Sequence, residues 1–271
     1  MSSPITRIEG ARRELVVIVP TYNTAPTAPG VVRALLVDSA GAVDHVVVID
    51  NASQDGTLAA IRNLCAQEPE LAPRVTLIQN PRNLGYGGSI KLAFALVAEK
   101  YPLISIMHSD DQCDAARTMR DMVAAMGARE RPEAALASRF CGDADTREYS
   151  WSRRLGNRFF NVLTRRVSGL PMSDAGTAIM IIQSSALRCL PYSDLTSGYR
   201  YHCQLNLLIY GNPTFTIAEV PLTWRNASVG VPFSLVRYGV ALLRLLGAFA
   251  WRRRFLRRSL DESVRASERE A

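Results

Sequence analysis

Short apolar runs alternate with helix-like segments through the first part of the chain. Residues 15–19 (LVVIV) and 45–49 (HVVVI) are continuous, mostly β-branched runs, which is typical of strands buried on both faces. The segment 28–40 between them has apolar residues at helical spacing, and a second helix is expected to end near residue 64. This strand-helix-strand-helix order predicts an α/β fold with a mostly parallel central sheet and helices on both of its faces.

The same alternation continues to residue 112. A strand at 75–79 leads into a glycine-containing loop, a helix is predicted over 89–99, and a fourth strand at 103–107 runs into the sequence HSDDQ. Parallel strands joined by crossover helices bring their carboxyl ends to one edge of the sheet, where ligands bind. We therefore expect one site at that edge, made from Tyr22, Asp50, the loop 82–88 and residues 108–112.

The organisation changes beyond residue 134. The elements expected there are a strand at 134–138, an arginine-rich helix at 151–166, a strand at 178–182, a helix at 199–210 and a strand at 215–220. A length of 271 residues without an internal repeat favours a single main domain. The expected division is that domain over 1–232, a basic amphipathic helix over 233–258 and a polar tail over 259–271.

The net charge of +7 arises from one segment near the carboxyl terminus. Residues 233–258 hold seven arginines and no acidic residue, so the rest of the chain is neutral overall. Residues 238–251 are apolar, but Arg244 interrupts them and they fall short of the roughly 20 residues that cross a bilayer. We expect a helix that lies on an anionic membrane surface; the alternative is a helix packed on the main domain.

The remaining composition excludes other classes of protein. The five cysteines form no CxxC pair or metal-ligand spacing, and no apolar leader follows the amino terminus, which favours a cytoplasmic location. The basic segment offers neither a stacking platform nor a recognisable nucleic-acid-binding fold, so no nucleic-acid partner is expected. The expected location is therefore cytoplasmic and peripheral, on the inner face of the membrane.

Two adjacent carboxylates, Asp110 and Asp111, follow the fourth predicted strand. Neighbouring carboxylates at the end of a buried strand repel one another, and a hard divalent cation would relieve that repulsion. Such a cation could also bridge the phosphates of a nucleotide and stabilise the charge on a leaving diphosphate. The residues alone leave a second interpretation open, in which either aspartate caps a helix over 114–126.

Asp50 and the glycine-containing loop are the other polar features of this edge. Asp50 could accept hydrogen bonds from a ribose or a base, but an Asx turn is equally consistent with its surroundings. The glycines within 85–88 follow the third strand instead of the first and lack the GxGxxG spacing. They therefore do not indicate a dinucleotide-binding oxidoreductase.

Eight short motifs follow one another along most of the chain. They are VVIVPTYN (16–23), VVVIDNASQDGT (46–57), NPRNLGYGGSIKLAF (80–94), MHSDDQ (107–112), ASRF (137–140), SDAGTAIMI (173–181), GYRYHCQLNLL (198–208) and EVPLTWR (219–225). Their order resembles that of family 2 glycosyltransferases, and most closely the branch that transfers mannose to dolichyl or polyprenyl phosphate. The resemblance implies a GT-A fold, a sugar donor linked to GDP or UDP, and Mg2+ or Mn2+ as cofactor.

The resemblance also implies roles for residues at the donor side. By position, Pro20, Tyr22 and Asp50 would line the nucleoside pocket, and Asn83 and Gly85 would contact the nucleotide.

The implied metal ligands all lie in the HSDDQ segment. Asp110 would be the main ligand of the metal and the diphosphate, and Gln112 an auxiliary ligand. His108 stands where the family usually has its first aspartate, which makes it a third ligand and leaves the choice of metal open.

Other matched positions point to the sugar and the acceptor. The resemblance places Arg139, Asp174 and Arg225 there, and the planar guanidinium of arginine suits phosphate because it binds two oxygens at once. An ordinary salt bridge is the alternative role for each of the three. The expected catalytic residues are Asp110, Asp111, Asp174 and Arg225.

The acceptor decides whether a general base is needed. Many relatives have a carboxylate where this chain has Gln204, but a polyprenyl phosphate is already anionic and needs no base. A hydroxyl acceptor would need one, and Asp111 or Asp174 would be the candidates. We expect inverting transfer of mannose from GDP-mannose, or of glucose from UDP-glucose, to a lipid phosphate. The alternatives are transfer to a hydroxyl of a polysaccharide, natural product or protein, and a non-catalytic nucleotide-sugar-binding protein.

Overall fold

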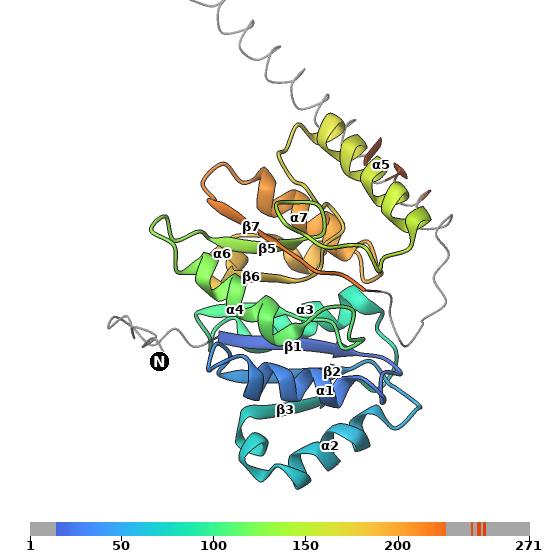
Figure 1. Cartoon of the computed structure of the whole chain (residues 1–271), viewed down its shortest axis with the longest axis vertical. Coiled ribbons are helices and arrows are strands. Elements are labelled where there is room, and N and C mark those ends of the chain that lie inside the picture. The colour runs from blue at the N-terminus through green and yellow to red at the C-terminus, as the bar shows by residue number, and fades with distance from the viewer. Residues whose placement is uncertain (1–14, 226–239, 241–242, 245, 248–271) are drawn as a thin grey trace, which may run out of the picture.

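A single mixed sheet organises the chain (Figure 1). The computed structural model describes residues 15–225, 240, 243–244 and 246–247. Within them, seven strands lie in the order β3-β2-β1-β4-β6-β5-β7, and only β6 runs antiparallel to its neighbours. The strands are β1 (Leu15–Thr21), β2 (His45–Asp50), β3 (Val75–Gln79), β4 (Leu103–Ile106), β5 (Ala134–Ser138), β6 (Met180–Gln183) and β7 (Ile217–Pro221).

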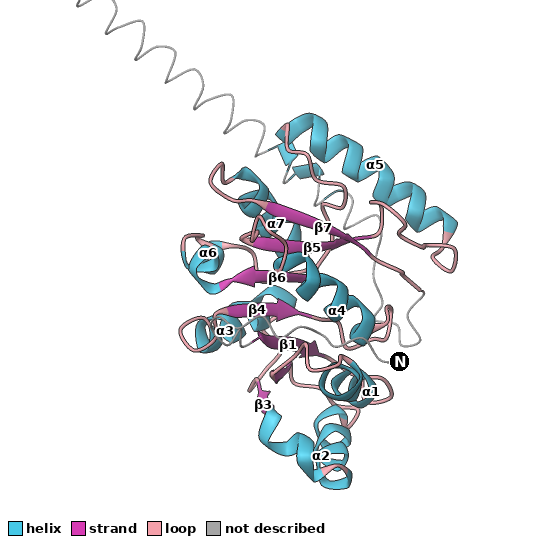
Figure 2. Ribbon diagram, turned by 60° about the vertical axis from the view of Figure 1, so that its left-hand side comes forward, coloured by secondary structure: helices cyan, strands magenta, loops and turns pink. Residues whose placement is uncertain are grey.

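Helices cover both faces of this sheet (Figure 2). One face packs against α1 (Ala28–Arg33), α2 (Thr57–Gln67) and α4 (Ala115–Met126), and the other against α3 (Tyr86–Val97), α6 (Ser184–Arg188) and α7 (Tyr201–Gly211). The remaining long helix, α5 (Trp151–Ser168), lies at the outside of the molecule, beyond β7 (Figures 1 and 2). A π-helical turn (Ala34–Asp38) and two 3-10 helices (Pro69–Arg74 and Tyr192–Asp194) complete the described elements.

The apolar runs form strands because both sides of the sheet are covered. All seven residues of β1 are buried; Val17 and Val19 belong to the core on the α1 and α4 side, while Val16 and Ile18 belong to the core on the α3 side. Successive side chains of a strand point to opposite faces, so in a strand between two helical layers every side chain is buried and apolar residues are favoured throughout. The α/β fold with a mostly parallel sheet and helices on both faces is thereby confirmed.

The helix after β3 begins earlier than the predicted 89–99. It starts at Tyr86, so Gly87 and Gly88 form its first turn. A Cβ on Gly87 would lie 2.5 Å from the carbonyl oxygen of Thr196, and one on Gly85, whose φ is +75°, 2.5 Å from that of Ser197. Glycine is therefore required at positions 85 and 87, because the start of α3 lies against the later loop that contains Thr196 and Ser197.

The predicted carboxyl-terminal segments fall largely outside the described residues, and the division into 1–232, 233–258 and 259–271 stays a prediction. The described residues of the 233–258 segment are helical, and one of them, Leu246, is buried with Cys203 against α5. In the described part of the chain, no helix has both the length and the hydropathy that crossing a bilayer requires.

Candidate active site

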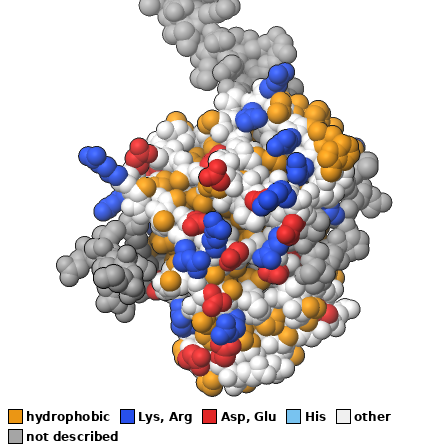
Figure 3. Space-filling model, in the orientation of Figure 1, with side chains coloured by type: hydrophobic (Ala, Val, Ile, Leu, Met, Phe, Trp, Pro, Cys, Tyr) orange, Lys and Arg blue, Asp and Glu red, His pale blue; other side chains and the backbone are white. Residues whose placement is uncertain are grey.

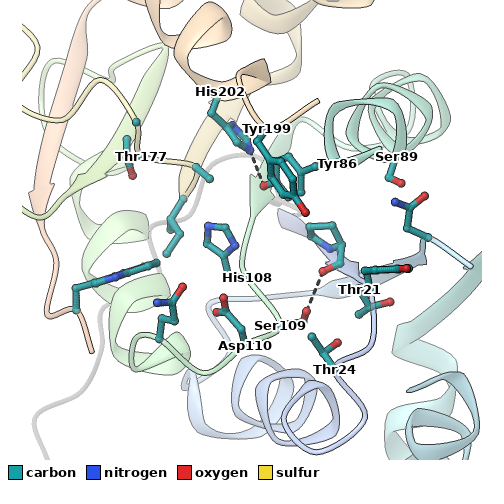
Figure 4. A pocket seen from close by; sticks show the side chains of 18 of the residues that line it. Thr21, Thr24, Tyr86, Ser89, His108, Ser109, Asp110, Thr177, Tyr199 and His202 are labelled. Carbon is teal, nitrogen blue, oxygen red and sulfur yellow. Dashed lines mark hydrogen bonds between the residues drawn. The ribbon is translucent and has the colours of Figure 1, made fainter. Parts of the chain in front are cut away.

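A cavity of about 560 Å3 lies over the carboxyl ends of the parallel strands. Its walls come from the end of β1, the start of α3, the segment after β4, the segment before β6, the start of α7 and the chain after β7 (Figure 4). The predicted gathering of distant segments at one sheet edge is thus present. Of the residues proposed from the sequence, the cavity is lined by Pro20, Tyr22, Asn83, Gly85, His108, Asp110, Gln112 and Arg139.

Asp50 lies below this cavity and does not line it. Its side chain is fully buried, and its Oδ1 accepts hydrogen bonds from the hydroxyls of Thr21 (3.0 Å) and Ser53, while Oδ2 accepts one from the backbone N–H of Ser53 (2.9 Å). The bond from Ser53 N–H, three residues on, is a local side-chain-to-backbone contact, although an Asx turn would use the residue two positions on. In this structure Asp50 therefore holds the floor of the pocket beneath Pro20 and Tyr22.

The next residue, Asn51, joins β2 to the glycine-containing loop. Its Nδ2 donates to Asn83 Oδ1 (2.8 Å), and its Oδ1 accepts from the backbone N–H of Leu84 (2.8 Å). The glycine-containing loop also packs against Thr196 and Ser197. Gln204 holds this second segment, because its Oε1 accepts a hydrogen bond from the N–H of Thr196 (2.9 Å). These bonds fix the wall formed by Asn83 and Gly85.

The HSDDQ segment is anchored at Ser109 and turns its two carboxylates apart. The Ser109 hydroxyl donates to the carbonyl of Pro20 (2.9 Å), and its own carbonyl accepts from the hydroxyl of Thr27 (2.6 Å). Asp110 lines the cavity, whereas Asp111 adopts a left-handed φ of 55° and carries a side chain that is 55% exposed. Neither caps the following helix, since Asp114 does so by accepting from the N–H of Arg117 (2.9 Å).

Gln112 links this segment to the chain after β7. Its carbonyl accepts from the N–H of Arg225 (2.8 Å), and its Nε2 donates to the carbonyl of Arg225 (3.3 Å), which leaves Oε1 as its remaining acceptor. The Arg225 side chain does not line the cavity and lies 3.9 Å from Asp111. Trp224 lines the cavity in its place, because adjacent residues of an extended chain point in opposite directions.

A divalent cation fits the chemistry of this corner. Asp110 Oδ1 is buried without a hydrogen-bond partner among the described residues, and such an oxygen is costly unless a cation or donor meets it. No group of three or more His, Cys, Asp or Glu side chains placed to hold a metal occurs in the described part of the chain. The protein thus offers Asp110, with His108 and Gln112 nearby. Mg2+ is commonly bound in that way, by one or two carboxylates together with phosphate oxygens of the substrate.

Two histidines and two tyrosines form an aromatic wall that begins at His108, beside Asp110 (Figure 4). The Tyr86 ring stacks with His108 (centroids 6.2 Å apart) and Tyr199 (6.2 Å), and its hydroxyl lies 2.5 Å from His202 Nε2. Burial lowers the pKa of His202 to about 3, helped by repulsion from His108. Burial also lowers the pKa of His108, as does Arg139, although Asp110 acts in the opposite direction. Both rings are therefore neutral near pH 7.

Arg139 and Asp174 form a buried ion pair at the edge of the cavity. Arg139 Nε donates to Oδ2 (2.7 Å) and Nη2 to Oδ1 (2.8 Å), and the Asp174 side chain is only 1% exposed. The guanidinium also lies 5.4 Å from the ring centroid of Trp224 and 5.8 Å from that of Tyr149. Asp174 therefore holds Arg139 in place, and it does not itself line the cavity.

Several lining residues were not among the site residues proposed from the sequence. Tyr199 and His202 lie within the motif at 198–208 and Trp224 within that at 219–225, but the resemblance draws on Gln204 and Arg225 there. Tyr149 and Arg153 come from the start of α5 and its preceding loop, which no motif covers. Only the tertiary fold brings these residues to the cavity.

Comparison with known proteins identifies the class of enzyme to which this fold and site belong. Residues 16–190 match the family model for glycosyl transferase family 2, so the chain belongs to this family of glycosyltransferases. The chain is 24% identical to polyprenol monophosphomannose synthase of Mycolicibacterium smegmatis over 241 residues, which cover 85% of this chain and 88% of that protein.

Solved structures of glucosyl-3-phosphoglycerate synthase from Mycobacterium tuberculosis have the same GT-A fold. One, with Mn2+, uridine diphosphate and glucosyl-3-phosphoglycerate, aligns with a TM-score of 0.62 at 20% identity and covers 88% of this chain and 78% of that chain. Another, with Mg2+ and uridine diphosphate, aligns with a TM-score of 0.60 at 18% identity, over 86% of this chain and 79% of that chain. At this level of identity the likeness concerns the fold.

Proposed function

We propose that this glycosyltransferase moves a sugar, in the first instance mannose from GDP-mannose, to a polyprenyl phosphate at the cytoplasmic face of a membrane. The similarity to a polyprenol monophosphomannose synthase supports this acceptor. UDP-glucose is the second donor, since the structural neighbours were solved with uridine nucleotides.

One observation supports an acceptor that is already anionic: among the described residues, Asp110 is the only acidic side chain lining the cavity. Asp174 is engaged at both oxygens by Arg139, and Asp111 is turned away. The lowered pKa of His202, about 3, makes its ring a poor proton acceptor. A hydroxyl acceptor would need a base here, whereas a phosphate oxygen does not.

The transfer then follows as one displacement. A lone pair on the acceptor phosphate oxygen forms the bond to the anomeric carbon while the bond from that carbon to the diphosphate oxygen breaks, so the configuration inverts. The nucleoside diphosphate leaves with the bonding electron pair. Arg139 and Arg153, the two cationic side chains that line the cavity within the described residues, would bind and orient the acceptor phosphate.

The donor side would bind the nucleotide. Pro20 and Tyr22 would contact the nucleoside above the floor held by Asp50, and Asn83 and Gly85 would form the wall beside it. Asp110, with His108 and Gln112, would hold Mg2+ or Mn2+ against the diphosphate. Bound there, the cation would neutralise charge on the leaving group. Peripheral membrane attachment through the predicted 233–258 helix belongs to the same proposal.

The test is an assay of the purified full chain with GDP-mannose or UDP-glucose, Mg2+ or Mn2+, and a short-chain polyprenyl phosphate. We expect nucleoside diphosphate release only when metal and acceptor are both present, and an acid-labile product that extracts into organic solvent. Transfer to hydroxyl acceptors alone would contradict the lipid phosphate. Tight nucleotide binding without transfer to any acceptor would indicate a non-catalytic binding protein.

A further inference from the structure

The helix α5 exposes large apolar side chains in addition to those that it packs against the rest of the molecule. Its inner side combines the buried polar residues Asn161, Thr164 and Ser168 with partly buried apolar residues that contact Cys203 and Leu246, namely Phe160, Leu163 and Val167. Its exposed side carries large apolar residues, with exposed fractions of 74% for Trp151, 57% for Leu155, 59% for Phe159 and 42% for Val162. A helix of a water-soluble domain normally turns its apolar stripe towards the core.

The four exposed apolar residues form one continuous stripe. They occur at intervals of four, four and three residues, so at about 100° per residue they lie within an arc of about 80° on the helix. In the space-filling view, hydrophobic side chains gather at the position of α5, beside a row of basic side chains (Figure 3). We call these four residues (Trp151, Leu155, Phe159 and Val162) the α5 stripe, and contiguous exposed apolar side chains of this kind mark interaction surfaces.

The charge of α5 indicates what covers the stripe. The helix contains five arginines and no acidic residue, and Arg158 and Arg166 lie on the same side as the stripe by helical position. No described carboxylate forms an ion pair with any of these arginines. An apolar stripe flanked by arginines complements a bilayer with anionic headgroups, into which the apolar residues insert while the cations stay at the phosphates.

The position of the stripe relative to the cavity adds a second argument. Arg153, on the first turn of α5, lines the cavity, as does Tyr149 just before the helix, and Asn157 Nδ2 donates to the Tyr149 hydroxyl (2.8 Å). The helix that exposes the stripe is therefore also a wall of the acceptor side. A phosphate at the level of lipid headgroups would meet this wall.

We infer that the α5 stripe is a membrane-docking surface that seats the enzyme on an anionic bilayer, with the mouth of the cavity at headgroup level. The inference rests on the proposed function for the identity of the acceptor, but the docking surface can be tested without it. It assigns to a described helix a role that the sequence gave to the 233–258 segment.

The test measures partition of the full chain onto phosphatidylcholine vesicles with and without phosphatidylglycerol. The variant L155S/F159S should bind anionic vesicles about tenfold or more weakly than the wild type, because it removes two inserting side chains. The matched control is L92S/L96S, which removes leucines of 37% and 40% exposure at the same spacing on α3. It should bind as the wild type does. R158Q/R166Q should lose much of the preference for anionic over neutral vesicles.

Three results would overturn the inference. These are a wild-type chain that does not bind anionic vesicles, an L155S/F159S variant that binds them as well as L92S/L96S does, and a wild-type dimer that L155S/F159S dissociates in sedimentation analysis. The last would make the stripe an interface between two copies of this chain.

An activity comparison separates this inference from the proposed function. With a short, water-soluble prenyl phosphate, L155S/F159S should turn over at the wild-type rate, and with an acceptor embedded in vesicles it should be slower. Equal rates on both acceptors would count against docking through α5. If no acceptor is glycosylated by any variant, the proposed function fails, and vesicle partition still decides whether the α5 stripe binds a bilayer.

Discussion

The two halves of the cavity are held in different ways. In the donor half, residues 15–112, two carboxylates near the site are held by nearby chain: Asp50 accepts from Thr21 and Ser53, and Asp55 accepts from the N–H of Ala25 (2.9 Å). Two cavity-lining side chains of this half, Thr24 at Oγ1 and Asp110 at Oδ1, have no hydrogen-bond partner at those atoms among the described residues. In the acceptor half, residues 134–225, two cavity-lining side chains keep buried polar atoms without a partner among the described residues. They are Nδ1 of His202 and Nε1 of Trp224.

This difference suggests how each half meets its ligand. A site whose polar atoms are already fixed is preorganised, so little conformational entropy is lost when the ligand binds. A buried polar atom without a partner costs folding free energy, and a ligand that supplies the partner recovers it. We therefore regard the part of the donor half held by Asp50 and Asp55 as preorganised, and the unpartnered atoms of both halves as the points that a ligand completes. Of these points, Asp110 provides the sharpest test.

Replacing Asp110 should have the largest effect. We expect Asp110→Asn to lower kcat by about a thousandfold, the loss typical of one group that stabilises charge in a transition state. Asp111→Asn is the matched control, since the residue is adjacent, exposed and left-handed, a conformation that asparagine tolerates. It should retain activity within about threefold of the wild type. Comparable losses in the two variants, measured as nucleoside diphosphate release, would show that the assignment of Asp110 is wrong.

Asp174→Asn tests whether that residue positions Arg139 or acts as a base. The change leaves a guanidinium of 12% exposure without its carboxylate, so we expect a loss of about 3 kcal/mol in the free energy of unfolding. The KM for a phosphate acceptor should rise more than kcat falls. Asp145→Asn breaks an exposed pair with Arg147 and should cost much less. An Asp174→Asn protein of unchanged stability that loses the acidic limb of its pH-rate profile would instead identify a general base.

The sequence predicted the sheet and its active edge because those depend on local pattern. The direction of individual side chains depends on distant partners: Asp174 meets an arginine 35 residues earlier, and the glycines before α3 meet the loop at Thr196. Similarly, the periodicity of α5 indicates an amphipathic helix, but it cannot say which of its apolar residues pack inwards and which stay exposed. One motif contains both Trp224 and Arg225, so the sequence does not say which of them lines the cavity. The packing of the chain after β7 places Trp224 in the cavity wall.

Gly87→Ala should loosen the junction between the two halves. The added Cβ would lie 2.5 Å from the carbonyl oxygen of Thr196 and 2.7 Å from Cβ of Tyr201, so we expect a loss of about 2 kcal/mol in the free energy of unfolding. The control is Gly156→Ala on α5, where nothing lies within 4 Å of the new Cβ. It should be neutral or more stable by about 0.5–1 kcal/mol, because alanine favours a helix. Denaturant unfolding measures both, and an equally stable Gly87→Ala protein would show that the junction can yield.

His202→Gln should change how the free energy of unfolding depends on pH, because it removes a titrating side chain from the acceptor half. The folded pKa of His202, about 3, lies below its ordinary value of 6.5, so the unfolded chain binds the proton first. The stability that this neutral ring contributes is present above pH 6.5 and is lost as the pH falls towards the folded pKa.

Between pH 6.5 and about 5, the variant should therefore lose less stability, by about 1.4 kcal/mol per pH unit, than the wild type. The glutamine amide can keep a hydrogen bond to Tyr86, which limits any change in packing. His45→Gln is the comparison, because that half-buried ring bonds to Thr76 at the opposite end of β2 and its change should be smaller. The measurement is urea unfolding at several pH values. If the free energy of unfolding changes with pH equally in the wild type and His202→Gln, then His202 is hydrated in the folded protein and the acceptor half is more open to water than its structure indicates.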